Sequence, residues 1–154
     1  MHDRFLLNYE LHEHGWATAT LAHGENSVSM TVSYLHDSLR ELASAAHNLS
    51  RGSKHARVVF MDEPGEHQVI FEKLRFDELQ YTVTWFNDWD SWGMKTIPGS
   101  TQLFTGKVSP RRFVHQVNSI LWKLLDEYGE VAKLLQDFPH RLRPDLLLLA
   151  HHLA

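Results

Sequence analysis

The spacing of apolar residues changes from every second position to every third or fourth and back, and this change constrains the fold more than any other feature of the chain. From residue 4 to residue 12, Phe5, Leu7, Tyr9 and Leu11 alternate with polar residues, which is typical of a strand with one buried face. Similar segments follow at 15–22 and 27–33, and short turns between them predict a three-stranded meander.

The next segment has a helical spacing. From Leu35 to Leu49, leucines and alanines recur at intervals of four, three, four and three residues. Ser33 is available to cap the N-terminus of this helix, and Gly52 lies just past its end as a stop signal. We therefore expect a helix that begins close to Ser33 and ends close to Gly52.

A second run of strands follows this helix. Pro64 and Gly65 suit the two central positions of a type II turn and predict a hairpin, because glycine accepts a positive φ. The alternating pattern predicts strands at 57–62, 67–75, 78–86 and 101–108. Ser109 followed by Pro110 then gives an N-cap and a first helical residue, and an apolar stripe continues from Phe113 to Tyr128.

The order of these elements is β-β-β-α-β-β-β-β-α, and most connections between strands are too short for parallel crossovers. This order predicts an α+β fold with a mainly antiparallel sheet of six to seven strands and helices packed on one face. The other face is expected to be polar, and either open or covered by a second copy in a homodimer. The 154 residues indicate one domain, 1–154, in which 139–154 forms a C-terminal helical tail.

The composition limits the classes of partner and the cellular compartment that we expect for this chain. The net charge of −4 gives no general attraction to nucleic acid or to anionic membranes, so neither is expected as a partner. The absence of cysteine excludes disulfides and thiolate metal sites and favours a cytoplasmic location. The first residues lack the apolar core of a signal peptide, and the longest aliphatic run, from Leu146 to Ala150, is too short to span a bilayer.

Three of the five tryptophans fall within the ten residues from Trp85 to Met94, where a strand runs out into a loop. Alternation places Trp85 on the buried face of its strand, whereas Trp89 and Trp92 lie past the strand end. These two side chains either fold back over the edge of the sheet or stand exposed as binding anchors. If they are exposed, the neighbouring acidic residues favour a basic protein partner. The predicted partner-binding residues are Asp88, Trp89, Asp90 and Trp92.

The histidines and carboxylates do not form a pattern that is typical of an active site. There are twelve histidines, but none of their clusters supplies the three or four convergent ligands that a zinc site needs, and His12 and His14 are interpreted as exposed turn residues. Asp62, Glu63 and Glu66 crowd the predicted hairpin turn, where we expect them on a solvated tip. No phosphate-binding loop or nucleophile elbow is present, so no catalytic residue, metal site or cofactor is predicted.

Four short motifs carry a resemblance to other sequences. They are Gly15-Trp16-Ala17, Ser33-Tyr34-Leu35, Asp62-Glu63-Pro64-Gly65-Glu66 and Trp85-Phe86-Asn87-Asp88-Trp89. With their order along residues 9–128, the chain resembles a group of small uncharacterised bacterial proteins. The resemblance implies no activity and no catalytic residue.

Two functions fit these observations. The first is a protein-binding module, such as an inhibitor of the immunity or antitoxin type, that uses the acidic tryptophan-rich loop. The alternative is a small-molecule-binding or metal-dependent enzyme whose site is built from dispersed His and Asp or Glu residues. A third reading is a structural subunit that assembles through the leucine-rich C-terminal tail. The missing catalytic motif favours the first.

Overall fold

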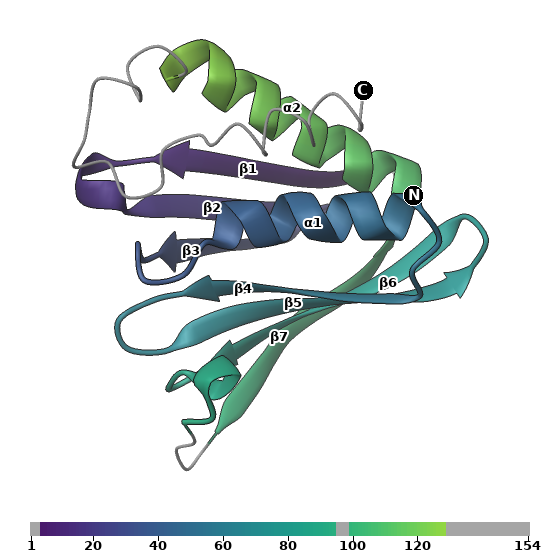
Figure 1. Cartoon of the computed structure of the whole chain (residues 1–154). Helices are drawn as coiled ribbons and strands as arrows, with labels where there is room; N and C mark the ends of the chain where they lie inside the picture. Colours follow the sequence, from purple (N-terminus) through teal and green to yellow (C-terminus); the bar gives the residue numbers. More distant parts are fainter. Residues whose placement is uncertain (1–3, 95–98, 129–154) are drawn as a thin grey trace.

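The computed structural model describes residues 4–94 and 99–128 (Figure 1). Within these ranges the α+β class and the order of the elements are confirmed. The elements are β1 (Phe5–Leu11), β2 (Ala17–His23), β3 (Asn26–Val32), α1 (Ser38–Ser50), β4 (His55–Met61), β5 (Glu66–Arg75), β6 (Glu78–Phe86), β7 (Ser100–Val108) and α2 (Pro110–Tyr128). The predicted tail at 139–154 lies outside the described residues. Among the helices that are described, none is long and apolar enough to cross a membrane.

The strands form two antiparallel sheets in place of the single sheet that the strand order predicts. One sheet has the order β1-β2-β3 and the other β4-β5-β6-β7. They meet where the backbone N–H of Ser33 donates to the carbonyl of Met61 at 2.6 Å. Their inner faces also touch, because the ring of Phe5 on β1 packs edge-on against Tyr81 on β6 at 5.1 Å. The core therefore lies between the two sheets.

The helices close the side of this core. Helix α1 packs along β4, α2 packs along β1, and the two helices contact each other. Each helix also satisfies backbone groups of the strand beside it. On α1, Ser38 donates to the Val59 carbonyl and Glu41 accepts from the Val59 N–H, while Gln116 on α2 accepts from the Leu7 N–H. The helices thus protect the two strand edges that they cover from pairing with other chains.

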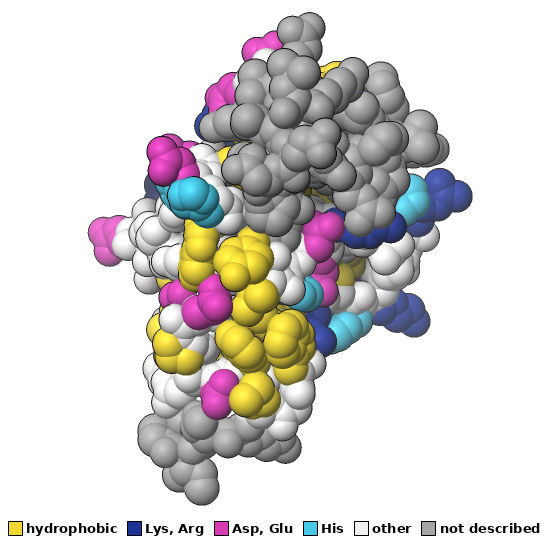
Figure 2. Space-filling view, turned by 60° about the vertical axis from the view of Figure 1, so that its left-hand side comes forward, with side chains coloured by type: hydrophobic (Ala, Val, Ile, Leu, Met, Phe, Trp, Pro, Cys, Tyr) yellow, Lys and Arg dark blue, Asp and Glu magenta, His cyan; other side chains and the backbone are white. Residues whose placement is uncertain are grey.

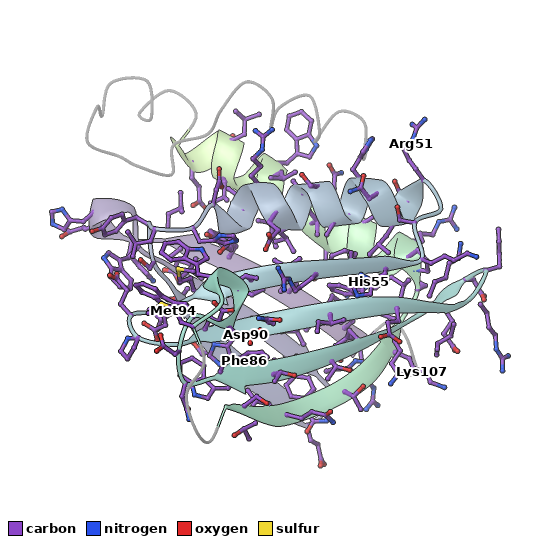
Figure 3. The ribbon with its side chains drawn as sticks, turned by 60° about the horizontal axis from the view of Figure 1, so that its bottom comes forward. Arg51, His55, Phe86, Asp90, Met94 and Lys107 are labelled. Atoms are coloured by element: carbon purple, nitrogen blue, oxygen red, sulfur yellow. The ribbon has the colours of Figure 1, made fainter. Side chains whose placement is uncertain are left out.

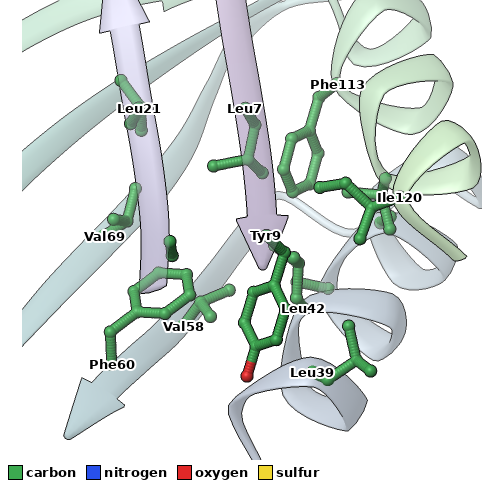
Figure 4. Close-up of a cluster of buried hydrophobic side chains, with 14 of the residues drawn as sticks. Leu7, Tyr9, Leu21, Leu39, Leu42, Val58, Phe60, Val69, Phe113 and Ile120 are labelled. Carbon is green, nitrogen blue, oxygen red and sulfur yellow. The ribbon is translucent and has the colours of Figure 1, made fainter. Parts of the chain in front are cut away.

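The inward residues of the strands and one stripe of each helix make one continuous core (Figure 4). Its centre is aromatic, since the rings of Phe71 and Phe113 lie 4.4 Å apart and Phe5 and Tyr81 pack beside them. Tyr81 carries the polar group of this cluster, and its hydroxyl is hydrogen-bonded to Nδ1 of His23 at 2.6 Å. Burial raises the pKa of Tyr81 to about 12, so this hydroxyl keeps its proton at neutral pH.

The start of α1 differs from the prediction. The helix begins at Ser38, and the side chain of Asp37 accepts a backbone N–H of the first turn as the N-cap. Ser33, the predicted cap, is fully buried, and its hydroxyl donates to the carboxylate of Glu63 at 2.8 Å. A long-range hydrogen bond thus occupies the residue that local sequence favours as a cap, and Tyr34 and Leu35 lie in a loop ahead of the helix.

The outer faces of the two sheets differ. On the first sheet the outward side chains are largely exposed and polar, as predicted, and include Ser27, Ser29 and Thr31 of β3. On the second sheet, Glu66 and Gln68 of β5 point outward and are nevertheless buried. The segment that covers them is the loop between β6 and β7, which carries the tryptophans.

Candidate functional site

Four segments gather at one end of the molecule. They are 12–16, 33–37, 61–66 and 86–94, and we call them together the acidic end. Besides the contact between β3 and β4, the indole Nε1 of Trp89 donates to the Asp62 carbonyl at 2.8 Å, and the Trp16 and Tyr34 rings lie 6.2 Å apart. The four segments contain seven Asp or Glu residues and no Lys or Arg. The described residues of these four segments therefore carry a concentrated negative charge.

The tryptophan loop has a defined backbone path. After β6 ends at Phe86, residues 90–92 form a short 3-10 turn, and Gly93 takes a left-handed conformation with φ of 80°. The backbone N–H groups of Trp92 and Met94 both donate to the Trp89 carbonyl at 3.0 Å. The carboxylate of Asp88 accepts the N–H of Trp89 at 2.8 Å. These bonds tie the backbone of the loop together through residue 94.

A buried carboxylate ties this loop to the sheet. Glu66 has no exposed surface, and it accepts hydrogen bonds from the Ser91 hydroxyl at 2.7 Å, the Ser91 N–H at 3.1 Å and the Gln68 amide at 2.6 Å. The same amide of Gln68 lies 3.2 Å from the carboxylate of Asp90. The prediction that Glu66 sits on a solvated tip is therefore wrong, because a loop distant in sequence covers it. Glu63, in contrast, is exposed as expected.

Of the two arrangements expected for Trp89 and Trp92, folded back or exposed, each tryptophan adopts a different one. Trp89 is half-buried and folds back over the β4–β5 turn, held by the bond from its Nε1. Trp92 packs edge-on against it with the ring centroids 5.0 Å apart, and 52% of its surface is exposed. Asp88 and Asp90 are half-buried and hydrogen-bonded within the site. Of the four predicted residues, Trp92 is therefore the one that presents a large apolar surface outward.

Trp85 has the predicted inward register, opposite His67, but it is only partly buried. Its ring lies 4.7 Å from the ring of His67, and its Nε1 donates to the side chain of Asn87 at 2.9 Å. Burial lowers the pKa of His67 to about 4, so this imidazole is neutral at physiological pH. The indole also lies over Gly65, where a Cβ atom would come within 2.4 Å of the ring.

An apolar patch lies at the acidic end, and Figure 2, which brings this end forward, shows hydrophobic side chains gathered there among carboxylates. The exposed members are Tyr34, Leu35, Trp92 and Met94, with exposed fractions of 38 to 52%. Tyr34 and Leu35 were not predicted, because the helical spacing assigns Leu35 to the buried stripe of a helix. The signal that could have found them is Asp37, a second N-cap candidate that would place both residues in a loop.

Several side chains that could act as acids or bases at this end, among them Glu63, Glu66 and His36, are engaged in structural hydrogen bonds. Nε2 of His36 lies 3.2 Å from the carboxylate of Glu41, and this bond, followed by the nearby charges of Glu41, Glu66 and Asp37, raises the pKa of His36. The described residues contain no group of three or more His, Asp or Glu side chains arranged to hold a metal ion. The chemistry that this arrangement supports best is contact with cationic and apolar groups of another molecule.

Neither a protein-family model, nor a curated protein, nor a solved structure matches this chain. The functional proposal therefore rests on the geometry of the acidic end.

Proposed function

We propose that this protein is a protein-binding module that holds a basic segment of a partner protein on the acidic end. One observation carries the proposal: Trp92 is 52% exposed on a loop that the buried carboxylate of Glu66 fixes to the sheet. A large aromatic side chain held outward on an ordered loop is the usual form of a binding hot spot.

The order of the loop favours binding. The hydrogen bonds of Ser91 to Glu66 and of Trp92 and Met94 to Trp89 exist before a partner arrives. Association therefore does not have to order this segment, and the loss of conformational entropy on binding is reduced. The exposed members of the apolar patch, Tyr34 and Leu35, widen the surface that a partner can cover.

Charge selects the kind of partner. Six of the seven carboxylates of the acidic end are exposed or half-buried, and the four segments contain no Lys or Arg, so this surface attracts a basic surface and repels an acidic one. The exposed indole of Trp92 adds a ring face on which an Arg or Lys side chain can stack. An inhibitor of the immunity or antitoxin type, acting on a basic toxin, would use a surface of this kind.

Capture from native lysate tests the proposal. The wild-type protein and the Trp92→Ala variant are immobilised in parallel, and the bound proteins are identified by mass spectrometry. Leu103→Ala is the matched control, since Leu103 on β7 is 42% exposed and lies outside the acidic end. We expect a basic protein that the wild type and the control retain and the Trp92 variant loses. Equal retention by all three would overturn the proposed surface.

A purified partner then allows a quantitative test. Its affinity should fall as the salt concentration rises, because exposed charges are screened over about 8 Å at physiological ionic strength. An affinity that does not depend on salt would contradict recognition by the carboxylates, even if Trp92 contributes.

A further inference from the structure

The end of the molecule opposite the acidic end is basic. It comprises Arg4 and the segments 23–26, 51–57, 72–78 and 106–112, which together hold nine Lys or Arg and four Asp or Glu residues. Figure 3 shows the separation, with Arg51, His55 and Lys107 toward one end and Phe86, Asp90 and Met94 toward the other. The net charge of −4, on which we expect no attraction to anionic membranes, is thus an average over two ends of opposite sign.

The most exposed large apolar side chain of the described residues lies at this basic end. Phe76, at the tip of the hairpin between β5 and β6, is 91% exposed, and Leu74 beside it is 43% exposed. This hairpin projects past the end of α1 (Figure 1). Lys73 and Arg75 alternate with the two apolar residues, and the ammonium of Lys73 lies 6.0 Å from the centre of the Phe76 ring.

Further cations surround the hairpin. The backbone N–H of Lys73 donates to the carbonyl of Lys54 at 2.8 Å, which places the exposed Lys54 beside the hairpin, and the exposed Arg51 lies three residues before Lys54 in the chain. The carboxylates of the hairpin are Glu72, Asp77 and Glu78, and Glu78 lies 3.9 Å from the ammonium of Lys107. The hairpin itself holds two cations and three carboxylates, and with Arg51, Lys54 and Lys107 the count becomes five Lys or Arg against three Asp or Glu.

We propose that the basic end docks on an anionic lipid surface. Phe76 and Leu74 enter the boundary between headgroups and acyl chains, while Lys73, Arg75 and Lys54 lie at the level of the lipid phosphates. A lipid surface fits better than a protein, because a stable protein interface needs about 800 Å² per partner, whereas a bilayer accepts a single protruding side chain. In this orientation the acidic end faces away from the membrane.

Sedimentation with lipid vesicles tests this docking. We expect the wild-type protein to bind phosphatidylcholine vesicles that contain phosphatidylserine and not to bind pure phosphatidylcholine vesicles. The bound protein should dissociate from the vesicles as the salt concentration is raised. Phe76→Ser should weaken binding about tenfold, and Phe76→Trp should retain it. Lys73→Glu with Arg75→Glu should weaken it by more than tenfold, since each cation near an anionic surface contributes about a fivefold gain in affinity.

Two controls separate this site from the acidic end. Leu103→Ser removes an apolar side chain of similar exposure to Leu74, and Trp92→Ala alters the proposed protein-binding surface; both should bind vesicles as the wild type does. Phe76 is almost fully exposed, so its variants should have unchanged melting temperatures. Absence of binding to the anionic vesicles, equal binding by the Phe76→Ser variant, or binding to heparin or duplex DNA without binding to vesicles would each overturn the proposal.

Discussion

The carboxylate of Glu66 and the hydroxyl of Ser91 lie 2.7 Å apart, although 25 residues separate them in the sequence. This bond, with the backbone N–H of Ser91, joins the tryptophan loop to the outer face of β5. The loop in turn buries Glu66 completely. The same contact therefore stabilises the fold and positions the proposed binding surface.

Removing the carboxylate of Glu66 should affect both the stability of the fold and the position of the tryptophan loop. In Glu66→Ala, the Gln68 amide and both Ser91 donors lose their acceptor, so the free energy of unfolding should fall by about 2 to 3 kcal/mol. Ser91→Ala removes one hydrogen bond and should lower it by about 1 kcal/mol. Urea unfolding measures both changes, and Glu10→Ala, at an exposed position of β1, is the control. A stability of Glu66→Ala equal to that of the control would show that the loop is not held by this carboxylate.

Two glycines with positive φ should respond differently to alanine. Gly65 has φ of 87°, and a Cβ atom there would lie 2.4 Å from the Trp85 ring and 2.7 Å from the Phe86 carbonyl. Gly52 has φ of 102°, but nothing lies within 4 Å of its Cβ position. Gly52→Ala should therefore lower the free energy of unfolding by about 1 to 2 kcal/mol from backbone strain. Gly65→Ala should lower it by a further 1 to 3 kcal/mol from the clash. Thermal unfolding compares the two variants, and equal losses would argue against the close packing of Trp85.

The pH dependence of stability should report the burial of His67. Its folded-state pKa is lowered to about 4 from 6.5, so between these values the unfolded chain binds a proton that the folded protein does not. The contribution of His67 is complete above pH 6.5 and is lost as the pH falls toward 4. His36 acts in the opposite sense: its raised pKa adds stability below pH 6.5, which is lost as the pH rises through the folded value. Between pH 6.5 and 4, urea midpoints should fall less steeply with acid in His67→Gln than in wild type. Above pH 6.5, where the folded wild type gains stability as His36 binds its proton, the midpoints of His36→Gln should rise less as the pH is lowered toward 6.5. Parallel profiles would contradict the assignment.

Trp89 and Trp92 should separate stability from binding. Trp89 is half-buried and donates its Nε1 to the Asp62 carbonyl, so Trp89→Ala should lower the free energy of unfolding by about 2 to 3 kcal/mol. Trp92 is more exposed, and Trp92→Ala should lower stability by less than about 1 kcal/mol while reducing partner affinity at least tenfold. Urea unfolding and titration with the captured partner measure the two effects. A Trp92 variant that loses stability without losing affinity would assign Trp92 to the fold alone.

Much of the fold could be predicted because its signals are local. Alternation at Phe5, Leu7 and Tyr9 identifies the inward face of β1, and all three are buried. The predicted cap of α2 is present, since the Ser109 hydroxyl accepts the N–H of Arg112 at 3.0 Å. The hairpin between β4 and β5 and the positive φ of Gly65 are confirmed as well. The predicted type II turn centred on Pro64 and Gly65 is wrong, because Met61 pairs with Glu66, which puts Glu63 and Pro64 at the centre of the turn, and the bond between these two residues is cis. Each of the confirmed features depends on residues close together in the chain.

The candidate site was predicted only in part, because its support comes from distant segments. The sequence places Trp89 and Trp92 in one loop, but their different exposure depends on the β4–β5 turn beneath Trp89. The outward register of Glu66 follows from strand periodicity, whereas its burial depends on Ser91 in a later loop. Ser33 likewise does not cap the helix as expected, because its hydroxyl donates to the distant carboxylate of Glu63.

The sequence by itself determined the order of the strands and helices and most of the residues that face the core, since periodicity and turn chemistry act over a few residues. Only the tertiary structure decided that the strands divide into two sheets and that α1 and α2 cover the edges at Val59 and Leu7. It also decided that carboxylates gather at one end and cations at the other, around Phe76. The physical reason is that the chain reverses between antiparallel strands, so that every second turn lies at the same end of the molecule. Which turns lie together depends on how the strands pair, and neither composition nor a local pattern predicts that pairing.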